Sequence, residues 1–172
     1  APTLALAGEI GQNPRFARKS PAALKSWQRN EAYVRLDHPV VPFVGRLCIT
    51  YIFATSGIAK VMAWRDNVAY MGTRHLPVIP VLLAIAAVVE LGGSLCLITG
   101  FQARVAAFVM FLYTTAVTLV FHNYWAYSGM LAGTQETHFR KNLAIMGGLL
   151  ILAYCGPGKW AVGQGARAPE PA

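Results

Sequence analysis

Charge is scarce in this sequence. Only 13% of its 172 residues are charged, whereas 55% are hydrophobic, and the mean hydropathy is +0.44. A soluble globular domain has about 25% charged residues, so this chain lacks the charge that would cover a water-facing surface. The scarcity excludes a disordered chain, a coiled coil and an ordinary cytosolic enzyme, and it indicates a membrane protein.

Acidic residues are scarcer still, with 7 Asp and Glu against 15 Lys and Arg and a net charge of +8. Six of the basic residues precede residue 38: Arg15, Arg18, Lys19, Lys25, Arg29 and Arg35. In so apolar a chain, a basic segment favours anionic lipid headgroups over nucleic acid. We therefore expect residues 1–38 to form a basic cytoplasmic tail with a short interfacial helix within residues 20–35, and no nucleic-acid partner.

Cysteine and cofactor motifs are also scarce. The three cysteines, Cys48, Cys96 and Cys155, are isolated and form no C-x-x-C pair, and the sequence has no zinc-protease, dinucleotide-binding or P-loop motif. We predict no metal site. Two histidines near one end of the expected bundle, His122 and His138, are too weak a signal for haem.

Long apolar runs are what the chain does have. A membrane-spanning helix needs about 20 apolar residues, because a rise of ~1.5 Å per residue must cross a hydrocarbon core of ~30 Å. Four runs approach this length, at about residues 40–62, 78–99, 105–125 and 139–155. The fourth is the weakest, because Arg140, Lys141 and Asn142 occupy its first turn.

The predicted fold is therefore all-α, a four-transmembrane-helix bundle with short loops within residues 39–158. Residues 159–172 are expected to form a flexible cytoplasmic tail. Four spans place both termini on the same side of the membrane. Since most Lys and Arg residues outside the spans fall in the tails and in the turn with Arg104, the positive-inside rule places both termini in the cytoplasm.

Ionisable residues inside a span are costly and are candidates for function. At ~1.5 Å per residue, Arg46 and Glu90 lie roughly 9 Å and 14 Å from the cytoplasmic ends of the first and second spans. An arginine side chain can cover this difference in depth. The sequence therefore predicts an intramembrane ion pair between Arg46 and Glu90, with the alternative that these residues only fix the register of the helices.

A second group of polar residues approaches the opposite face of the membrane. Its members are Lys60, His122, Trp125, Gln135, His138 and Lys141. Together they predict a net-positive cluster at the mouth of the bundle, suited to an anion, a carbonyl oxygen or a quinone headgroup. The alternatives are that the lysines extend to the lipid headgroups and that His122 bonds to a neighbouring helix. No residue is assigned a catalytic role.

Small residues recur four apart on two of the expected spans. Gly92, Cys96 and Gly100 form one row, and Ala144 and Gly148 form another. Rows of this kind let two helix backbones approach closely in a membrane. Both are predicted to be helix-packing faces.

Residues 43–158, two-thirds of the chain, resemble the DoxX-like family of small four-span membrane proteins. The resemblance rests on the order and spacing of Gly45-Arg46, Ser56–Lys60, Glu90–Gly93, Gly100–Arg104, Phe121-His122, Trp125, His138–Asn142 and Gly147-Gly148. The family takes its name from a membrane subunit associated with thiosulfate:quinone oxidoreduction and quinol oxidase systems.

The resemblance implies a small accessory or structural subunit of a larger redox-type complex in a bacterial inner membrane. Its partners would be lipid and other membrane subunits, and it would not be catalytic alone. A first alternative is a redox subunit that itself binds quinone, which is the one cofactor the resemblance brings in. A small-solute or ion carrier is a weaker alternative, since the sequence shows no inverted repeat.

Overall fold

The computed structural model describes residues 38–163. These residues belong to a single compact unit that begins at His38. The expected basic tail with its interfacial helix, and the end of the chain from residue 164, lie outside the described residues.

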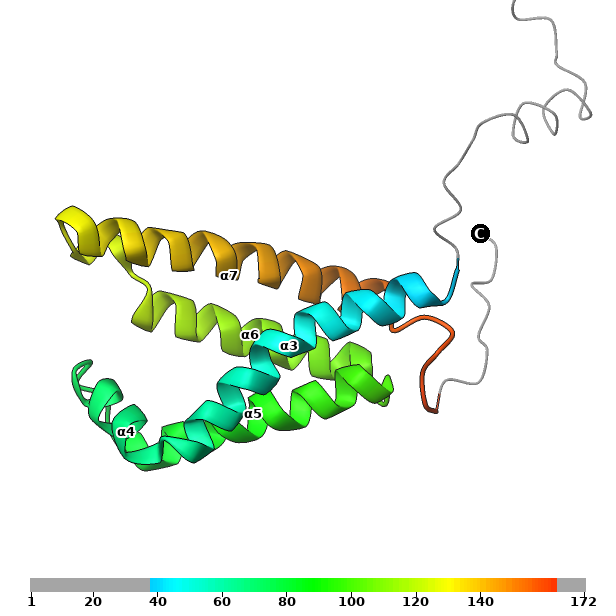
Figure 1. Cartoon of the computed structure of the whole chain (residues 1–172), viewed down its shortest axis with the longest axis horizontal. Coiled ribbons are helices and arrows are strands. Elements are labelled where there is room, and N and C mark those ends of the chain that lie inside the picture. Colours follow the sequence, from blue (N-terminus) through cyan, green and yellow to red (C-terminus); the bar gives the residue numbers. More distant parts are fainter. Residues whose placement is uncertain (1–37, 164–172) are drawn as a thin grey trace, which may run out of the picture. The chain divides into compact units, whose positions relative to one another are not determined.

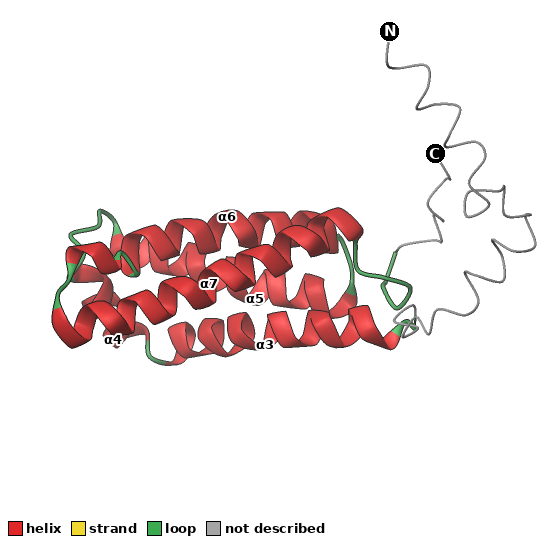
Figure 2. Ribbon diagram, turned by 90° about the horizontal axis from the view of Figure 1, so that it is seen from above, coloured by secondary structure: helices red, strands yellow, loops and turns green. Residues whose placement is uncertain are grey.

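The described part of the chain is helical and contains no strand. Its elements are α3 (Val40–Met62), α4 (Trp64–Gly72), α5 (Ile79–Thr99), α6 (Ala103–Phe121), the 3-10 helix η1 (Tyr124–Ala126) and α7 (Gly129–Cys155). The four long helices lie side by side (Figures 1 and 2), with α5 packed on α3 and α6, and α7 packed on α6 and α3. The all-α prediction is confirmed. Three segments are long and apolar enough to cross a membrane, namely α3, α5 and residues 103–126.

The apolar runs place the first three long helices well. The first matches α3 at both ends, and α5 begins one residue later than expected. The turn after α5 is tight, because Gly100 adopts a left-handed conformation (φ 79°) that ends the helix and that glycine tolerates without strain. The third helix begins at Ala103 and ends at Phe121, short of the expected residue 125.

The fourth long helix differs from the prediction. It begins at Gly129 rather than at residue 139, so most of the segment expected to connect the third and fourth spans is helical. Glu136 and Arg140 form an ion pair of 2.6 Å one turn apart on it, an arrangement that supports an exposed helical turn. Hydropathy located only the apolar half of α7, because its first half is stabilised by local polar contacts.

The short helix α4 was not predicted. It follows a break in the helix at Ala63 (φ −108°, ψ 48°), and Figure 1 shows it bending away from the end of α3. Its first turn carries Arg65, Asp66 and Asn67, so no apolar run marks it. Val78, the residue immediately before α5, adopts a left-handed conformation (φ 45°), which is unusual and strained for a β-branched residue.

The predicted small-residue faces are only partly correct. Gly148 packs on α3, since a Cβ there would lie 3.2 Å from Ile49 Cδ1, but a Cβ on Gly92 would meet nothing within 4 Å. Ala144 is exposed, and Gly100 ends α5. On α5 it is Gly93 that lies against Met110, because the helix turns this residue, and not its neighbour Gly92, toward α6.

The segment after α7 also departs from the expectation of a free tail from residue 159. The backbone oxygen of Trp160 accepts a hydrogen bond from Arg46, and the Val162 amide donates to Thr99 O at 2.8 Å. The Trp160 ring packs edge-on against Phe43, 5.8 Å between centroids. Residues 159–163 therefore lie against the end of the bundle where α3 begins.

Candidate ligand-binding site

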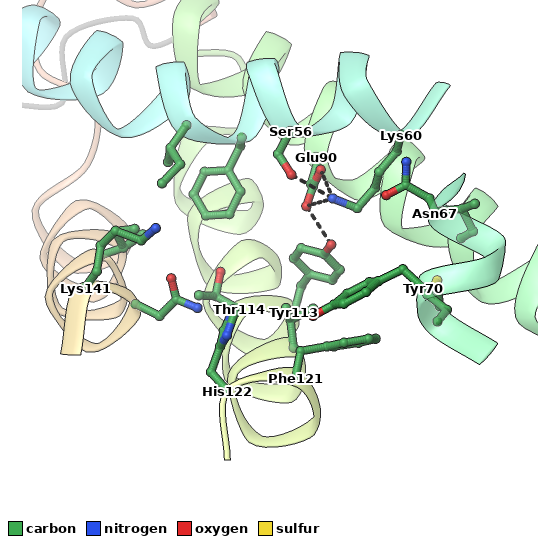
Figure 3. A pocket seen from close by; sticks show the side chains of 17 residues that line it. Ser56, Lys60, Asn67, Tyr70, Glu90, Tyr113, Thr114, Phe121, His122 and Lys141 are labelled. Atoms are coloured by element: carbon green, nitrogen blue, oxygen red, sulfur yellow. Dashed lines mark hydrogen bonds and ion pairs between the residues drawn. The ribbon is translucent and has the colours of Figure 1, made fainter. Parts of the chain in front are cut away.

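A cavity of about 280 Å³ lies between the helices and is lined by residues of α3, α4, α5, α6 and α7, with His122 at the end of α6 (Figure 3). Its polar lining consists of Ser56, Lys60, Asn67, Tyr70, Glu90, Tyr113, Thr114, His122, Lys141 and Asn142. Its apolar lining consists of Ile52, Phe53, Met71, Leu83, Val117, Phe121 and Ile145.

One side of the cavity holds a buried ion pair. Lys60 Nζ lies 2.9 Å from both carboxylate oxygens of Glu90 and 2.7 Å from Ser56 Oγ. Tyr113 donates its hydroxyl proton to Glu90 Oε1 at 2.6 Å, so side chains from α3, α5 and α6 meet at one carboxylate (Figure 3). The Glu90 side chain is 5% exposed and that of Lys60 19%. Burial of a carboxylate requires this degree of pairing.

The predicted ion pair between Arg46 and Glu90 is wrong, because Glu90 pairs with Lys60. The register of α3 and α5 gives the reason: a Cβ on Gly57 would lie 3.2 Å from Glu90 Cβ, so Gly57 is level with Glu90. Arg46 is eleven residues from Gly57, about 16 Å along the helix. The prediction compared depths on the assumption that the first two spans end at the same level of the membrane. In the structure, Arg46 instead lies beside the last turn of α5, far from Glu90.

Arg46 has a different role at that end of the bundle. Its Nη1 donates to Leu97 O at 3.0 Å and to Ile98 O at 3.3 Å, and Phe43 lies under the guanidinium at 5.4 Å. The last carbonyl groups of a helix have no partner within the helix and carry its negative dipole end. Arg46 satisfies two of these carbonyls on α5 and ties the segment after α7 to the same place.

The wall opposite Lys60 contains most of the predicted cluster. His122 Nδ1 forms a hydrogen bond of 2.8 Å with Gln135 Oε1, and the His138 ring stacks on His122 with 5.1 Å between centroids. Lys141 Nζ lies 3.3 Å from His138 Nδ1. Lys60, His122 and Lys141 therefore line one cavity, with Gln135 and His138 in contact with His122.

Trp125 is the one predicted member that stands apart from this group. Its ring packs against Tyr124 and Phe139, it is 60% exposed, and it does not line the cavity. This arrangement is typical of an aromatic residue at a membrane interface.

Several lining residues were not singled out from the sequence. Tyr113 lies within an apolar run of the sequence. Its role is revealed only by the structure, in which its hydroxyl bonds to Glu90. The sequence places Asn142 only in the first turn of the fourth apolar run, whereas in the structure its amide donates to Thr118 Oγ1 at 2.9 Å across to α6. A polar residue next to Lys141 in the first turn of the apolar stretch was the available signal for Asn142. The sequence held no comparable signal for Tyr113.

The short helix α4 covers the end of the cavity. Asn67, Tyr70 and Met71 line it, and the Tyr70 ring stacks on Phe121 with 5.7 Å between centroids. After α4, Arg74 donates to Phe121 O at 3.1 Å and to the Tyr127 hydroxyl. Burial opposes the charge of Arg74, but contacts with the Tyr70 and Tyr127 hydroxyls raise its pKa above the ordinary value. Arg74 thus remains a cation.

Long apolar helices that share a buried ion pair define a helical integral membrane protein. The DoxX family model matches residues 41–123. The chain is 35% identical over 121 residues to inner membrane protein YphA of Escherichia coli (strain K12), over 70% of this chain and 86% of that protein. It is 30% identical over 119 residues to inner membrane protein YqjF of the same organism, over 69% and 86% respectively. No solved structure matches it. The chain belongs to the DoxX family, as its sequence motifs predicted.

Proposed function

We propose that this protein spans a bacterial inner membrane four times and binds the headgroup of a quinone in the cavity. The names of its relatives YphA and YqjF support the location. The packing of α7 along α6 and α3 supports a fourth span. The excess of Lys and Arg before residue 38 supports cytoplasmic termini by the positive-inside rule.

The observation that carries the proposal is the placement of hydrogen-bond donors on facing walls of one cavity. The Ser56 hydroxyl, which accepts a hydrogen bond from Lys60 and keeps its own proton to donate, lies on one wall beside the Lys60–Glu90 pair, and His122 and Lys141 lie on the other (Figure 3). A quinone headgroup presents two carbonyl oxygens on opposite edges of a ring, and each oxygen accepts hydrogen bonds. Donors on opposite walls match this pattern.

The size and the apolar lining of the cavity fit the same headgroup. Small-molecule pockets have volumes of about 300–1,000 Å³, so a cavity of about 280 Å³ accommodates a single ring. Phe53, Tyr70 and Phe121 offer aromatic surfaces on which such a ring can pack. A small inorganic anion would leave these surfaces unused.

The residues present also fit the protonation that quinone chemistry requires. A bound quinone supplies two-electron redox chemistry, with the electrons delivered by a partner oxidoreductase of the membrane. His122, whose ring nitrogens can each carry or release a proton, would hold a proton at the cavity wall. Gln135 bonds to its Nδ1 and orients the ring so that Nε2 is free for this exchange.

The test is to purify the protein in mild detergent, extract its lipid and measure the quinone retained per protein. His122→Ala and Lys141→Ala should each lower the quinone content several-fold, because each removes a donor from the cavity wall. Arg140→Ala is the matched control, since this neighbour of Lys141 is exposed and pairs with Glu136. Unchanged quinone content in both cavity variants would contradict the proposal.

A second candidate function is that of an accessory subunit in a larger membrane complex. A Cβ added at Gly45, Gly92 or Gly147 would meet nothing within 4 Å, so these glycines lie on outer surfaces of the bundle. Small residues on an outer surface let a helix of another subunit approach closely. The two functions are compatible.

Co-purification after mild extraction tests the second candidate. A large membrane oxidoreductase should accompany the protein, and Gly92→Leu together with Gly147→Leu should reduce its recovery. Val88→Leu, a change of size at a position that is already large and exposed, serves as the control. A protein that purifies alone and is active by itself would argue against an accessory role.

A further inference from the structure

The charges that line the cavity do not balance. Glu90 is its one acidic residue, and Lys60 neutralises it with contacts of 2.9 Å to both oxygens. Tyr113 occupies Glu90 Oε1 as well. The carboxylate is therefore fully engaged, and the Lys60–Glu90 pair contributes no net charge to the space where a ligand would lie.

Lys141 is the cation that remains. The described residues include three acidic side chains, of which Glu90 pairs with Lys60 and Glu136 with Arg140. The third, Asp66, is exposed on α4, and no acidic group in this part of the chain lies within 4.0 Å of Lys141. Its one polar contact there is His138 Nδ1 at 3.3 Å. Two of the three ammonium protons are thus available to a ligand.

Other polar groups share this wall of the cavity with Lys141. His122 lies on it and is oriented by Gln135, and the Asn142 amide is already used by Thr118. None of these groups supplies a negative charge. Figure 3 shows the Lys141 amino group facing the Glu90 cluster from the far side of the cavity. A ligand oxygen that lies against this wall is therefore favoured when it carries negative charge.

We infer that the headgroup bound here carries an ionised oxygen paired with Lys141, so that the preferred ligand is a ring with an acidic hydroxyl, of the hydroxyquinone type. The inference rests on the proposed binding of quinone and names the class of quinone. A neutral quinone leaves the Lys141 charge without a partner, whereas a hydroxyquinone is ionised at neutral pH and supplies one. Lys141 is then the residue that determines specificity.

The experiment uses two benzoquinones with the same short alkyl tail. One carries a ring hydroxyl and the other a methoxy group in its place, so the two differ in charge and little in shape. Their dissociation constants are measured by equilibrium dialysis with the full chain in nanodiscs of zwitterionic lipid. Lys141 is exposed, and an exposed ion pair is worth about 0.2–1 kcal/mol, so the hydroxyquinone should bind up to about fivefold more tightly.

Three variants assign the preference to its residue. Lys141→Gln should give both probes the same affinity, Lys141→Arg should keep the preference, and Arg140→Gln should leave it unchanged. A preference that persists in Lys141→Gln would overturn the inference, and so would equal binding of both probes to the unmodified protein. If neither probe binds, the proposed function itself fails.

The phosphate of an anionic lipid could supply the same charge as the ligand. The measurement is therefore repeated in nanodiscs that contain phosphatidylglycerol. A hydroxyquinone held in the cavity keeps its advantage over the methoxy compound in this lipid. Loss of that advantage would show that Lys141 pairs with lipid, and it would overturn the inference.

Discussion

Glu90 illustrates how a chain with few charges uses them at the level of single residues. Its carboxylate is surrounded by Lys60 and Tyr113 within an apolar bundle, and a buried charge without a partner is strongly unfavourable. Lys60 and Glu90 can therefore be buried only together, as an ion pair. Its individual members cannot be replaced independently.

The first prediction concerns this pair. Glu90→Gln should lower the free energy of unfolding by about 3 kcal/mol, because it leaves the Lys60 charge buried without a partner. The measurement is denaturant unfolding in detergent micelles. Glu136→Gln, which breaks an exposed pair, should cost less than about 1 kcal/mol. The double variant Lys60→Met with Glu90→Gln should recover part of the loss, and no recovery would contradict this explanation.

His138 provides a prediction about pH. It precedes the apolar part of α7, and burial, followed by the positive charges of Lys141 and His122, lowers its pKa below the ordinary value of 6.5. The unfolded chain binds this proton more readily, so His138 contributes stability that is fully present above pH 6.5 and is lost as the pH falls below 6.5 and through the lower pKa of the folded state. Lys141→Gln should raise the pKa of His138 by removing a positive neighbour.

Titration of isotope-labelled histidine followed by NMR in micelles measures this change. Arg140→Gln should leave the pKa of His138 where it is, because Arg140 pairs with Glu136. A pKa of His138 that does not respond to Lys141→Gln would show that the two side chains do not interact in solution.

At the level of secondary structure, close contact between α3 and α5 depends on a glycine. A Cβ on Gly57 would lie 2.8 Å from Leu91 Cγ and 3.2 Å from Glu90 Cβ. Gly57→Ala should therefore lower the free energy of unfolding by about 1 kcal/mol, since the cost of overpacking exceeds the gain in helix propensity. Gly92→Ala, with open space around it, should be neutral or stabilising.

The thermal unfolding temperature in detergent compares the two variants directly. If Gly57→Ala is as stable as Gly92→Ala, the helices do not approach as closely as the structure shows. Because Gly57 lies beside Glu90, the same variant should also loosen the contact between Lys60 and Glu90.

The attachment of α4 gives a further prediction. Arg74 bonds to Phe121 O and to the Tyr127 hydroxyl, and hydrogen bonds to a charged group contribute about 1.5–3 kcal/mol. Arg74→Gln should therefore raise the rate of amide hydrogen exchange in α4 at least tenfold. Arg65→Gln, an exposed position on the same helix, should not. Equal exchange in both variants would show that Arg74 does not hold α4 in place.

Sequence reasoning succeeded for the elements that hydrophobicity defines, and it failed where geometry between elements decides. The limits of α3 and α5 follow from apolar length and a terminal glycine. The partner of Glu90 depends on how far α3 extends beyond α5 at the Arg46 end, and neither helix encodes that offset alone. For the same reason, the sequence could not show that Gly93 and not Gly92 meets α6. A repeat of small residues does not reveal how the helix is rotated about its axis relative to its neighbours.

For the whole molecule, the described residues place the polar cluster and the Arg46 contacts at different levels of one bundle. Lys60, His122 and Lys141 gather at one cavity, whereas Arg46 and Trp160 meet near the end of α5. The positions of Lys60 and His122 near the ends of their apolar runs correctly predicted that the two residues lie at the same depth in the bundle. Depth alone could not show that α4 covers this end, since α4 carries no apolar signal.

The number of spans yields the last prediction. At ~1.5 Å per residue, the 27 residues of α7 extend about 40 Å, enough to cross a membrane beside α6. Residues 65 and 136 should then face the periplasm, and residue 159 the cytoplasm with both termini.

The chain's three free cysteines are replaced by serine or alanine, and Arg65→Cys, Glu136→Cys and Lys159→Cys are introduced one at a time. A membrane-impermeant maleimide should label intact spheroplasts at positions 65 and 136, and label position 159 only after the cells are opened. Among the long helices of residues 38–163, α7 alone lacks an apolar run of spanning length. Equal accessibility at 136 and 159 would therefore mean that it does not cross, and the bundle would then have three spans.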